Sequence, residues 1–136
     1  MTTLVDSSVL LDVIAPSDWR EWSAARLAEA ADGGEVGINQ VIYAEIAAGF
    51  ATRERLERVL GGVGVKRLNL PFSAAWRVAN AFSQYRRAGG PRTIPLPDFF
   101  IGAHAAAAGL PLLTRDPARV RTYFPEVDLL APEEST

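Results

Sequence analysis

Four acidic residues that are far apart in the sequence occupy positions where a carboxylate could take part in chemistry: Asp6, Glu45, Asp98 and Asp116. Asp6 and Asp116 each follow a short, mostly apolar run that is typical of a buried strand. Glu45 shares a helix face with apolar or small neighbours, and Asp98 opens an almost wholly apolar segment. Acids that lie close together repel one another unless something neutralises them, so a cation is expected wherever these carboxylates meet.

Each of these acids also has a purely structural interpretation, which the sequence leaves open. Asp6 and Asp116 can be turn residues or helix caps, and Asp98 can be the N-cap of the helix that it opens. Glu45 can be paired with an arginine in the core, because an unpaired buried carboxylate is costly. The chemical interpretation gains weight because Asp6 and Asp116 should lie at the same edge of one sheet.

Few other residues offer catalytic chemistry. His104 is the only histidine and the chain has no cysteine, so a zinc site is not expected and His104 is predicted to be a packed or surface residue. Ser7 and Ser8 have no base nearby in the sequence and no nucleophile-elbow pattern. The sequence also has no glycine-rich phosphate-binding loop, so the four acids remain the main candidates.

The overall charge excludes a protein that coats nucleic acid through a uniformly basic surface. The 136 residues include 14 basic and 16 acidic side chains, which gives a formal net charge of −2, so contact with nucleic acid would need a local basic patch. No stretch approaches the roughly 20 apolar residues of a membrane-spanning helix, and no basic segment precedes an apolar one at the N-terminus. We therefore expect no membrane partner, no signal peptide and a cytoplasmic location, which the lack of cysteine also suits.

Strands alternate with helices along the whole chain, without repeats or long linkers. Residues 2–6, 35–38, 65–70, 110–114 and 127–131 are predicted strands, and residues 7–15, 17–32, 39–50, 52–62, 73–89, 98–109 and 116–124 are predicted helices. This alternation is typical of an α/β protein with a parallel sheet between two helix layers. Ligands of such sheets bind outside the carboxyl ends of the strands, where Asp6 and Asp116 are expected. Residues 132–136 are predicted to form a mobile tail.

The order of the acidic positions resembles the PIN-domain family, and the compact length resembles its VapC-type toxins. The resemblance spans about residues 2–130 and rests on four segments in this order: "VDSSVLLD", "NQVIYAEI", "PDFFIGAHA" and "LLTRDP". Each segment is weak evidence alone, but their order and spacing together are specific.

The resemblance implies a three-layer α/β/α sandwich with a central parallel sheet, formed by a single PIN-like domain over residues 1–131. It implies the toxin of a type II toxin–antitoxin system: a metal-dependent endoribonuclease whose catalytic acids Asp6, Glu45, Asp98 and Asp116 hold one or two Mg²⁺ or Mn²⁺ ions. Ser8 and Thr114 match polar positions that help to order this site in the family. It further implies a homodimer, an RNA substrate and a cognate antitoxin protein.

Hydrolysis of an RNA phosphodiester fits these residues, because the reaction needs an activated water and neutralisation of charge on the phosphate. Carboxylate oxygens suit hard cations, and a bound cation lowers the pKa of its water. The nearby arginines are candidate contacts to RNA phosphates, or else lie at solvated helix ends: Arg86, Arg87 and Arg92 before Asp98, and Arg115 and Arg119 beside Asp116.

Two other functions stay open at this point. A phosphoacceptor α/β domain has a similar length and strand-end aspartates, but it needs a lysine near the last strands, and the only lysine is Lys66. The second is a non-catalytic PIN-like interaction domain. If an antitoxin binds, Trp19 and Trp22 together with apolar residues of segment 39–50 form a groove for an amphipathic helix; otherwise both tryptophans are core residues.

Overall fold

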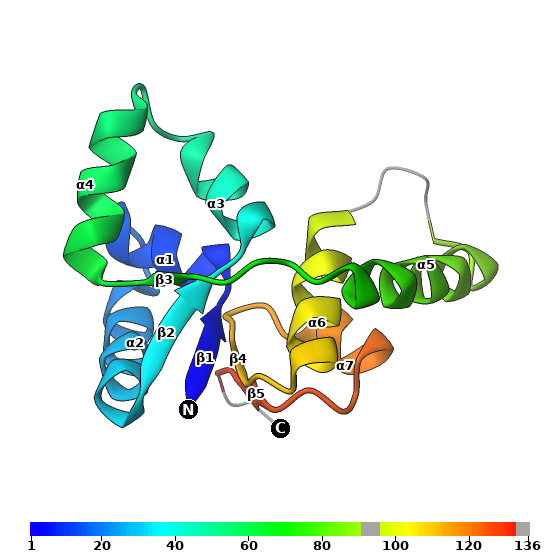
Figure 1. Cartoon of the computed structure of the whole chain (residues 1–136). Coiled ribbons are helices and arrows are strands. Elements are labelled where there is room, and N and C mark those ends of the chain that lie inside the picture. The colour runs from blue at the N-terminus through cyan, green and yellow to red at the C-terminus, as the bar shows by residue number, and fades with distance from the viewer. Residues whose placement is uncertain (91–95, 133–136) are drawn as a thin grey trace.

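Figure 1 shows the computed structural model of the chain, which describes residues 1–90 and 96–132. Five strands and seven helices alternate within these residues, as the sequence predicts. The strands are β1 (Thr2–Val5), β2 (Glu35–Ile38), β3 (Lys66–Arg67), β4 (Leu112–Leu113) and β5 (Leu129–Leu130). The helices are α1 (Ser7–Ile14), α2 (Arg20–Gly33), α3 (Gln40–Ala47), α4 (Arg53–Val63), α5 (Phe72–Arg87), α6 (Leu96–Ala108) and α7 (Ala118–Tyr123). Arg92 and the predicted tail beyond Pro132 lie outside the described residues.

The five strands form one parallel sheet in the order β3-β2-β1-β4-β5. β1 is the central strand, and the chain builds outwards on one side of it through β2 and β3 before it returns to the other side through β4 and β5 (Figure 1). This change of direction leaves a crevice at the carboxyl ends of two neighbouring strands, where α/β proteins bind ligands. The crevice lies between β1 and β4, whose register pairs Leu4 with Leu112 and Val5 with Leu113.

Helices cover both faces of the sheet, which confirms the predicted α/β/α sandwich (Figure 1). α1 packs on α2 and α2 on β2, while α5 and α7 both pack on α6. Because both faces are covered, the last two residues of β1 and both residues of β4 are apolar on both sides of the sheet, and Leu4, Val5, Leu112 and Leu113 are fully buried. None of the described helices is long and apolar enough to span a membrane.

Two predicted helix starts are wrong by a few residues. α2 begins at Arg20 rather than at Ser17, because the Ser17 hydroxyl donates to Asp12 and accepts from the Trp19 amide instead of capping the helix. α6 begins before Asp98, which puts this acid in the first turn rather than at the N-cap.

The end of α4 and the lengths of the strands also differ from the prediction. α4 continues through both glycines at 61 and 62 and ends at Gly64, whose φ of 82° is a left-handed conformation that glycine adopts without steric cost. β3 keeps only two residues of the predicted strand 65–70, since it pairs only with β2, through the register Gly37 to Lys66 and Ile38 to Arg67.

Candidate active site

Asp6 follows β1 and is held at the crevice by two hydroxyl groups. It occupies the N-cap position of α1, but its side chain does not cap the helix. Instead, its Oδ2 accepts hydrogen bonds from the Ser8 and Thr114 hydroxyls, both at 2.8 Å. The Asp6 amide also donates to the Leu113 carbonyl at 2.9 Å, which joins the ends of β1 and β4. The carboxylate is thus fixed at the point where the two central strands end.

Thr114 and Asp116 reach the same crevice from the end of β4. Thr114 is buried, and its hydroxyl donates to Asp6 while it accepts from the Asp116 amide at 3.0 Å. The Ser8 hydroxyl similarly accepts from the Arg115 amide at 3.3 Å. The side chain of Asp116 is 70% exposed. Ser8 and Thr114, the two polar residues predicted to order the site, both contact Asp6 directly.

Glu45 comes from α3, which starts directly after β2. The Asn39 side chain caps this helix by accepting from the Ile42 amide at 2.9 Å. Glu45 lies on the side of α3 that faces α1, where the Ser7 hydroxyl donates to its Oε1 at 2.9 Å. Its partner is therefore a serine, and not the core arginine that the structural interpretation requires.

Asp98 lies in the first turn of α6 and is paired with an arginine from α7. Arg119 Nη1 donates to Asp98 Oδ2 at 2.8 Å, and both side chains remain partly exposed. The pair connects the start of α6 to the loop and helix that follow β4.

The four acids line a single pocket with a volume of about 750 Å³ at the crevice. Polar residues from both central strand ends and from α7 complete its wall: Ser7, Ser8, Thr114, Arg115 and Arg119. The structure therefore brings together side chains from α3, from the start of α6 and from the ends of β1 and β4.

The carboxylates in this pocket act on one another. Burial raises the pKa of Glu45, and the charges of Asp6 and Asp98 raise it further, while the hydrogen bond from Ser7 opposes the shift. Burial also raises the pKa of Asp98, with contributions from Asp6 and Asp116 that Arg119 opposes. The pocket therefore disfavours additional negative charge and favours a cation.

The donor set suits a hard divalent cation, although the side chains are not gathered tightly. Among residues 1–90 and 96–132, no three His, Cys, Asp or Glu side chains lie close enough to hold a metal ion in their present positions. Mg²⁺, however, commonly binds through one or two carboxylates and keeps several waters. A cation among these oxygens would also relieve the repulsion that raises the pKa of Glu45 and Asp98.

Four of the five arginines predicted to contact RNA lie in the described part of the chain, and they fall into two groups. Arg115 and Arg119 line the pocket, and each is already paired with a carboxylate. Arg86 and Arg87 lie exposed in the last turn of α5 and do not line the pocket. Arg92 lies outside the described residues.

Two buried polar residues, His104 and Asp12, make contacts that were not predicted from the sequence. His104, predicted to be either packed or on the surface, is buried in α6, where the Asn39 side-chain amide donates to its Nδ1 at 3.0 Å and burial lowers its pKa. Asp12 was missed as a site residue, although an acid within the apolar segment "SSVLLDVIA" is the same kind of signal as Glu45 in its own helix. It is 3% exposed and pairs with Arg115 Nε at 2.8 Å.

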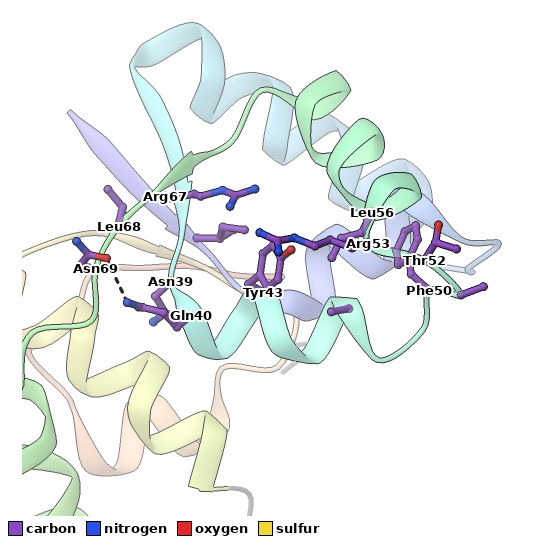
Figure 2. A pocket seen from close by; sticks show the side chains of 13 residues that line it. Asn39, Gln40, Tyr43, Phe50, Thr52, Arg53, Leu56, Arg67, Leu68 and Asn69 are labelled. Carbon is purple, nitrogen blue, oxygen red and sulfur yellow. Dashed lines mark hydrogen bonds between the residues drawn. The ribbon is translucent and has the colours of Figure 1, made fainter.

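A second hollow, of about 550 Å³, lies between α3, α4 and β3 (Figure 2). The apolar part of its wall comes from Ile38, Tyr43, Ala47, Phe50, Leu56 and Leu68. Arg53 and Arg67 approach one another near Tyr43, and both pair with Glu57, so that one carboxylate serves two guanidinium groups. The hollow shares no residue with the acidic pocket and has an excess of positive charge.

The model of the PIN domain family matches residues 3–125, a range that includes all four acids of the pocket. The chain belongs to the PIN domain family. Membership confirms the resemblance seen in the sequence and agrees with the parallel sheet and its helix layers. No curated protein matches the chain significantly.

Several solved VapBC structures contain chains whose fold is similar to this PIN domain. VapBC2 from Rickettsia felis, bound to a DNA fragment from its promoter, is 16% identical with a TM-score of 0.76, covering 98% of this chain and 100% of that chain. VapBC-1 from nontypeable Haemophilus influenzae is 16% identical with a TM-score of 0.74, covering 96% of this chain and 98% of that chain. VapBC-5 from Mycobacterium tuberculosis, a member of the VapBC family of toxin–antitoxin systems, is 22% identical with a TM-score of 0.59, covering 96% of each. The PIN fold thus extends over nearly the whole chain.

Proposed function

We propose that the protein is a toxin of the VapC type, an endoribonuclease that uses Mg²⁺ or Mn²⁺ to hydrolyse RNA in the cytoplasm. The observation that carries this proposal is the acidic pocket, where Asp6, Glu45, Asp98 and Asp116 meet at the crevice of a PIN-domain sheet. Carboxylates around one pocket favour cations because they repel one another, and phosphodiester hydrolysis is a reaction that cations promote.

Some residues of the pocket would bind the cation, and another would accept a proton. A bound divalent ion supplies an activated water and neutralises the charge that builds up on the phosphate. Asp6 is the most firmly held of the four acids, because Ser8 and Thr114 both donate to its Oδ2. Within residues 1–90 and 96–132, the Oδ1 atom has only a long contact, to Ser7 at 3.5 Å.

Glu45 is the residue best suited to accept a proton from the attacking water. Ser7 donates to its Oε1, so Oε2 is available at the pocket wall. The raised pKa of Glu45 makes it a stronger base than an ordinary carboxylate. Asp98 and Asp116 complete the negative wall that attracts the cation.

We assign the contacts to the RNA backbone to Arg119 at the pocket and to Arg86 and Arg87 beyond it, and Arg92 stays a predicted contact from the sequence alone. Arg119 forms an ion pair with Asp98. When a cation neutralises Asp98, the guanidinium of Arg119 can bind an RNA phosphate instead. Contacts to phosphate hold the substrate without reading its bases, so they do not specify a target sequence.

The exposed face of α5 supports a homodimer. Phe72 and Trp76 are 95% and 72% exposed and lie four residues apart, on the same side of the helix. A large exposed aromatic pair of this kind marks an interaction site. In a self-complementary dimer, the α5 helix of a second copy covers it.

An antitoxin is the second proposed partner, supported by the VapBC complexes of similar fold. The groove expected around Trp19 and Trp22 is only partly available, because Trp22 is half-buried and Trp19 packs edge-on against it. The hollow between α3 and α4 is a better docking site (Figure 2). Its apolar wall and its excess positive charge suit an antitoxin helix whose apolar anchors are flanked by acidic residues.

Neither alternative function gains support from the geometry. A phosphoacceptor domain needs a lysine beside the last strands, but Lys66 lies on β3, at the opposite edge of the sheet from β5, and pairs with Glu35. A non-catalytic PIN-like domain would share the fold, and experiment separates it from a nuclease.

Controlled expression in cells tests the proposal. Growth should stop, and mapping of RNA ends should reveal new cleavage sites. Asp6→Ala should abolish both effects, whereas Asp32→Ala, a matched change at an exposed acid of α2, should abolish neither. Co-expression with the product of the adjacent small reading frame should restore growth and yield a stable complex, which Phe50→Ser in the second hollow should weaken.

Two results would contradict the proposal. If the wild-type chain leaves RNA intact, it is not a nuclease under these conditions and the proposal fails. If Asp6→Ala stops growth as effectively as the wild type does, the effect does not come from the acidic pocket and the non-catalytic alternative is favoured.

A further inference from the structure

Asp12 is a buried carboxylate that the proposed cleavage chemistry does not use. It lies on α1 and is 3% exposed. Three donors surround it: the Ser17 and Ser23 hydroxyls, each at 2.7 Å, and Arg115 Nε at 2.8 Å. Burial alone would raise the pKa of Asp12, but these hydrogen bonds and the charge of Arg115 hold it below its usual value. Asp12 is therefore charged near neutral pH, and both of its carboxylate oxygens accept hydrogen bonds.

Arg115 connects the loop after β4 to this buried network. Its guanidinium points toward α1 and α2, where it bonds to Asp12 and lies 5.9 Å from the ring centre of Trp19. Its amide donates to the Ser8 hydroxyl. The loop of residues 114–116 is therefore held against α1 at two separate places, one beside Asp6 and the other at Asp12.

Asp116 depends on these neighbours for its position. Its side chain is 70% exposed, and its ion pair with Arg115 is long, at 4.0 Å. Its amide donates to the Thr114 hydroxyl. A residue of a functional site must be held to within about 0.5 Å of its productive position, usually by a supporting shell of other residues. For Asp116, that support comes from the loop of residues 114–116, which is held against α1.

We propose that Asp12 is a positioning residue for RNA cleavage. It holds the guanidinium of Arg115, and through Arg115 it fixes the loop that presents Asp116 to the acidic pocket. The inference rests on the nuclease function proposed for that pocket. It assigns Arg115 to the scaffold of the site, in place of the phosphate contact predicted from the sequence.

Two substitutions test the ion pair between Asp12 and Arg115, and each changes one of the two partners. Asp12→Asn keeps the shape, but it has no charge and only one acceptor oxygen, so it cannot hold Ser17, Ser23 and Arg115 as the carboxylate does. Arg115→Gln removes the guanidinium and leaves Asp12 with its two serine donors. Asp18→Asn is the matched control, because it makes the same chemical change at an exposed acid next to the start of α2.

Steady-state kinetics on an RNA substrate, well below the melting temperature, give the first test. Asp12→Asn and Arg115→Gln should each lower kcat by about ten- to a hundredfold, because a small misplacement of a site residue has effects of this size. KM for RNA should stay close to that of the wild type. The double variant should lose no more than the worse single variant, because both changes remove the same coupling.

Amide hydrogen exchange gives a second test that needs no activity. In Asp12→Asn, the amides of Arg115 and Asp116 should exchange about tenfold faster or more, because the loop opens more often. The amides of β1 should keep their rates, and Asp18→Asn should behave as the wild type does in both experiments.

The outcomes separate the inference from the function on which it rests. A wild-type kcat in Asp12→Asn overturns the inference, and so does a kcat that falls only in proportion to the unfolded fraction. A higher KM in Arg115→Gln with an unchanged kcat assigns Arg115 to RNA binding and also overturns it. If the wild type cleaves no RNA, the proposed function fails, and the exchange rates of the loop then decide whether Asp12 holds it.

Discussion

Glu45 lies half-buried on α3, where one serine donates to it and two other carboxylates, Asp6 and Asp98, act on its charge. Its pKa is raised chiefly by burial and also by these charges. A carboxyl group whose pKa is raised by folding binds its proton more readily in the folded state. Glu45 should therefore contribute stability to the metal-free protein as the pH falls through the pKa of the folded carboxyl, and that contribution is lost as the pH rises through it again.

Glu45→Gln should remove activity without removing the fold. The amide keeps the shape and can accept from Ser7, but it neither holds a cation by charge nor accepts a proton, so cleavage should fall by about a hundredfold or more. In chelator at pH 7 the variant should melt at a higher temperature than the wild type, because repulsion is relieved. It should also gain less stability than the wild type on acidification toward pH 5. Melting curves at the two pH values check this, and a variant that melts lower at pH 7 would identify Glu45 as a structural residue.

The acidic residues of the pocket were predictable from the sequence, but their contacts were not. Asp6, Glu45, Asp98 and Asp116 stand out because each opens, interrupts or ends an apolar segment. Asp12 also interrupts an apolar segment, but its partner Arg115 is 103 positions away in the sequence. A hydrogen bond between two such distant residues depends on how the strands are ordered, and sequence spacing does not reveal that order.

At the scale of the elements, α3 and α6 are tied together at a buried point. Asn39 caps α3 with its oxygen and donates with its nitrogen to His104 on α6. Burial lowers the pKa of His104, so the ring is neutral near pH 7 and its Nδ1 can accept this bond. Because α3 carries Glu45 and α6 carries Asp98, the bond fixes the distance between two acids of the pocket.

Asn39→Ala should weaken both the fold and the site. Loss of a helix cap costs about 1 kcal/mol, and leaving buried His104 without its partner adds about 1 kcal/mol or more. Cleavage by the folded protein should also fall, by about tenfold. Thr52→Ala is the control, because Thr52 caps α4 by accepting from the Arg55 amide, away from the acids. It should lower stability in urea denaturation but leave cleavage intact, and equal losses of cleavage in both variants would argue against the role of the Asn39 contact.

The number, type and order of the elements were predictable because apolar periodicity and caps are local signals. Asn39 illustrates this, since the polar residue that opens the predicted helix 39–50 is the N-cap of α3. Element ends were less predictable, because tertiary contacts compete with local signals. Ser17 is such a case: its hydroxyl is used by Asp12, and the helix starts later.

At the scale of the whole molecule, the order β3-β2-β1-β4-β5 places the site. The sequence predicts a parallel sheet, but it does not show that the first and fourth strands are neighbours. That pairing brings Asp6 within hydrogen-bond distance of Thr114 and opens the crevice where the acids from α3 and α6 meet. The exposed aromatic pair on α5 and the hollow beside α4 lie elsewhere on the molecule, so partners can bind without filling the acidic pocket.

The most direct measurement is RNA cleavage by the purified protein with and without a divalent cation, for the wild type and for Asp6→Asn. The wild type should cleave RNA with Mg²⁺ or Mn²⁺, lose this activity in excess chelator and recover it when the metal is returned, whereas Asp6→Asn should stay inactive throughout. The same metals should raise the melting temperature of the wild type more than that of the variant, because a ligand that binds the native state stabilises it. Cleavage that persists in chelator, or in Asp6→Asn, would contradict the claim that the acidic pocket is a metal-dependent nuclease site.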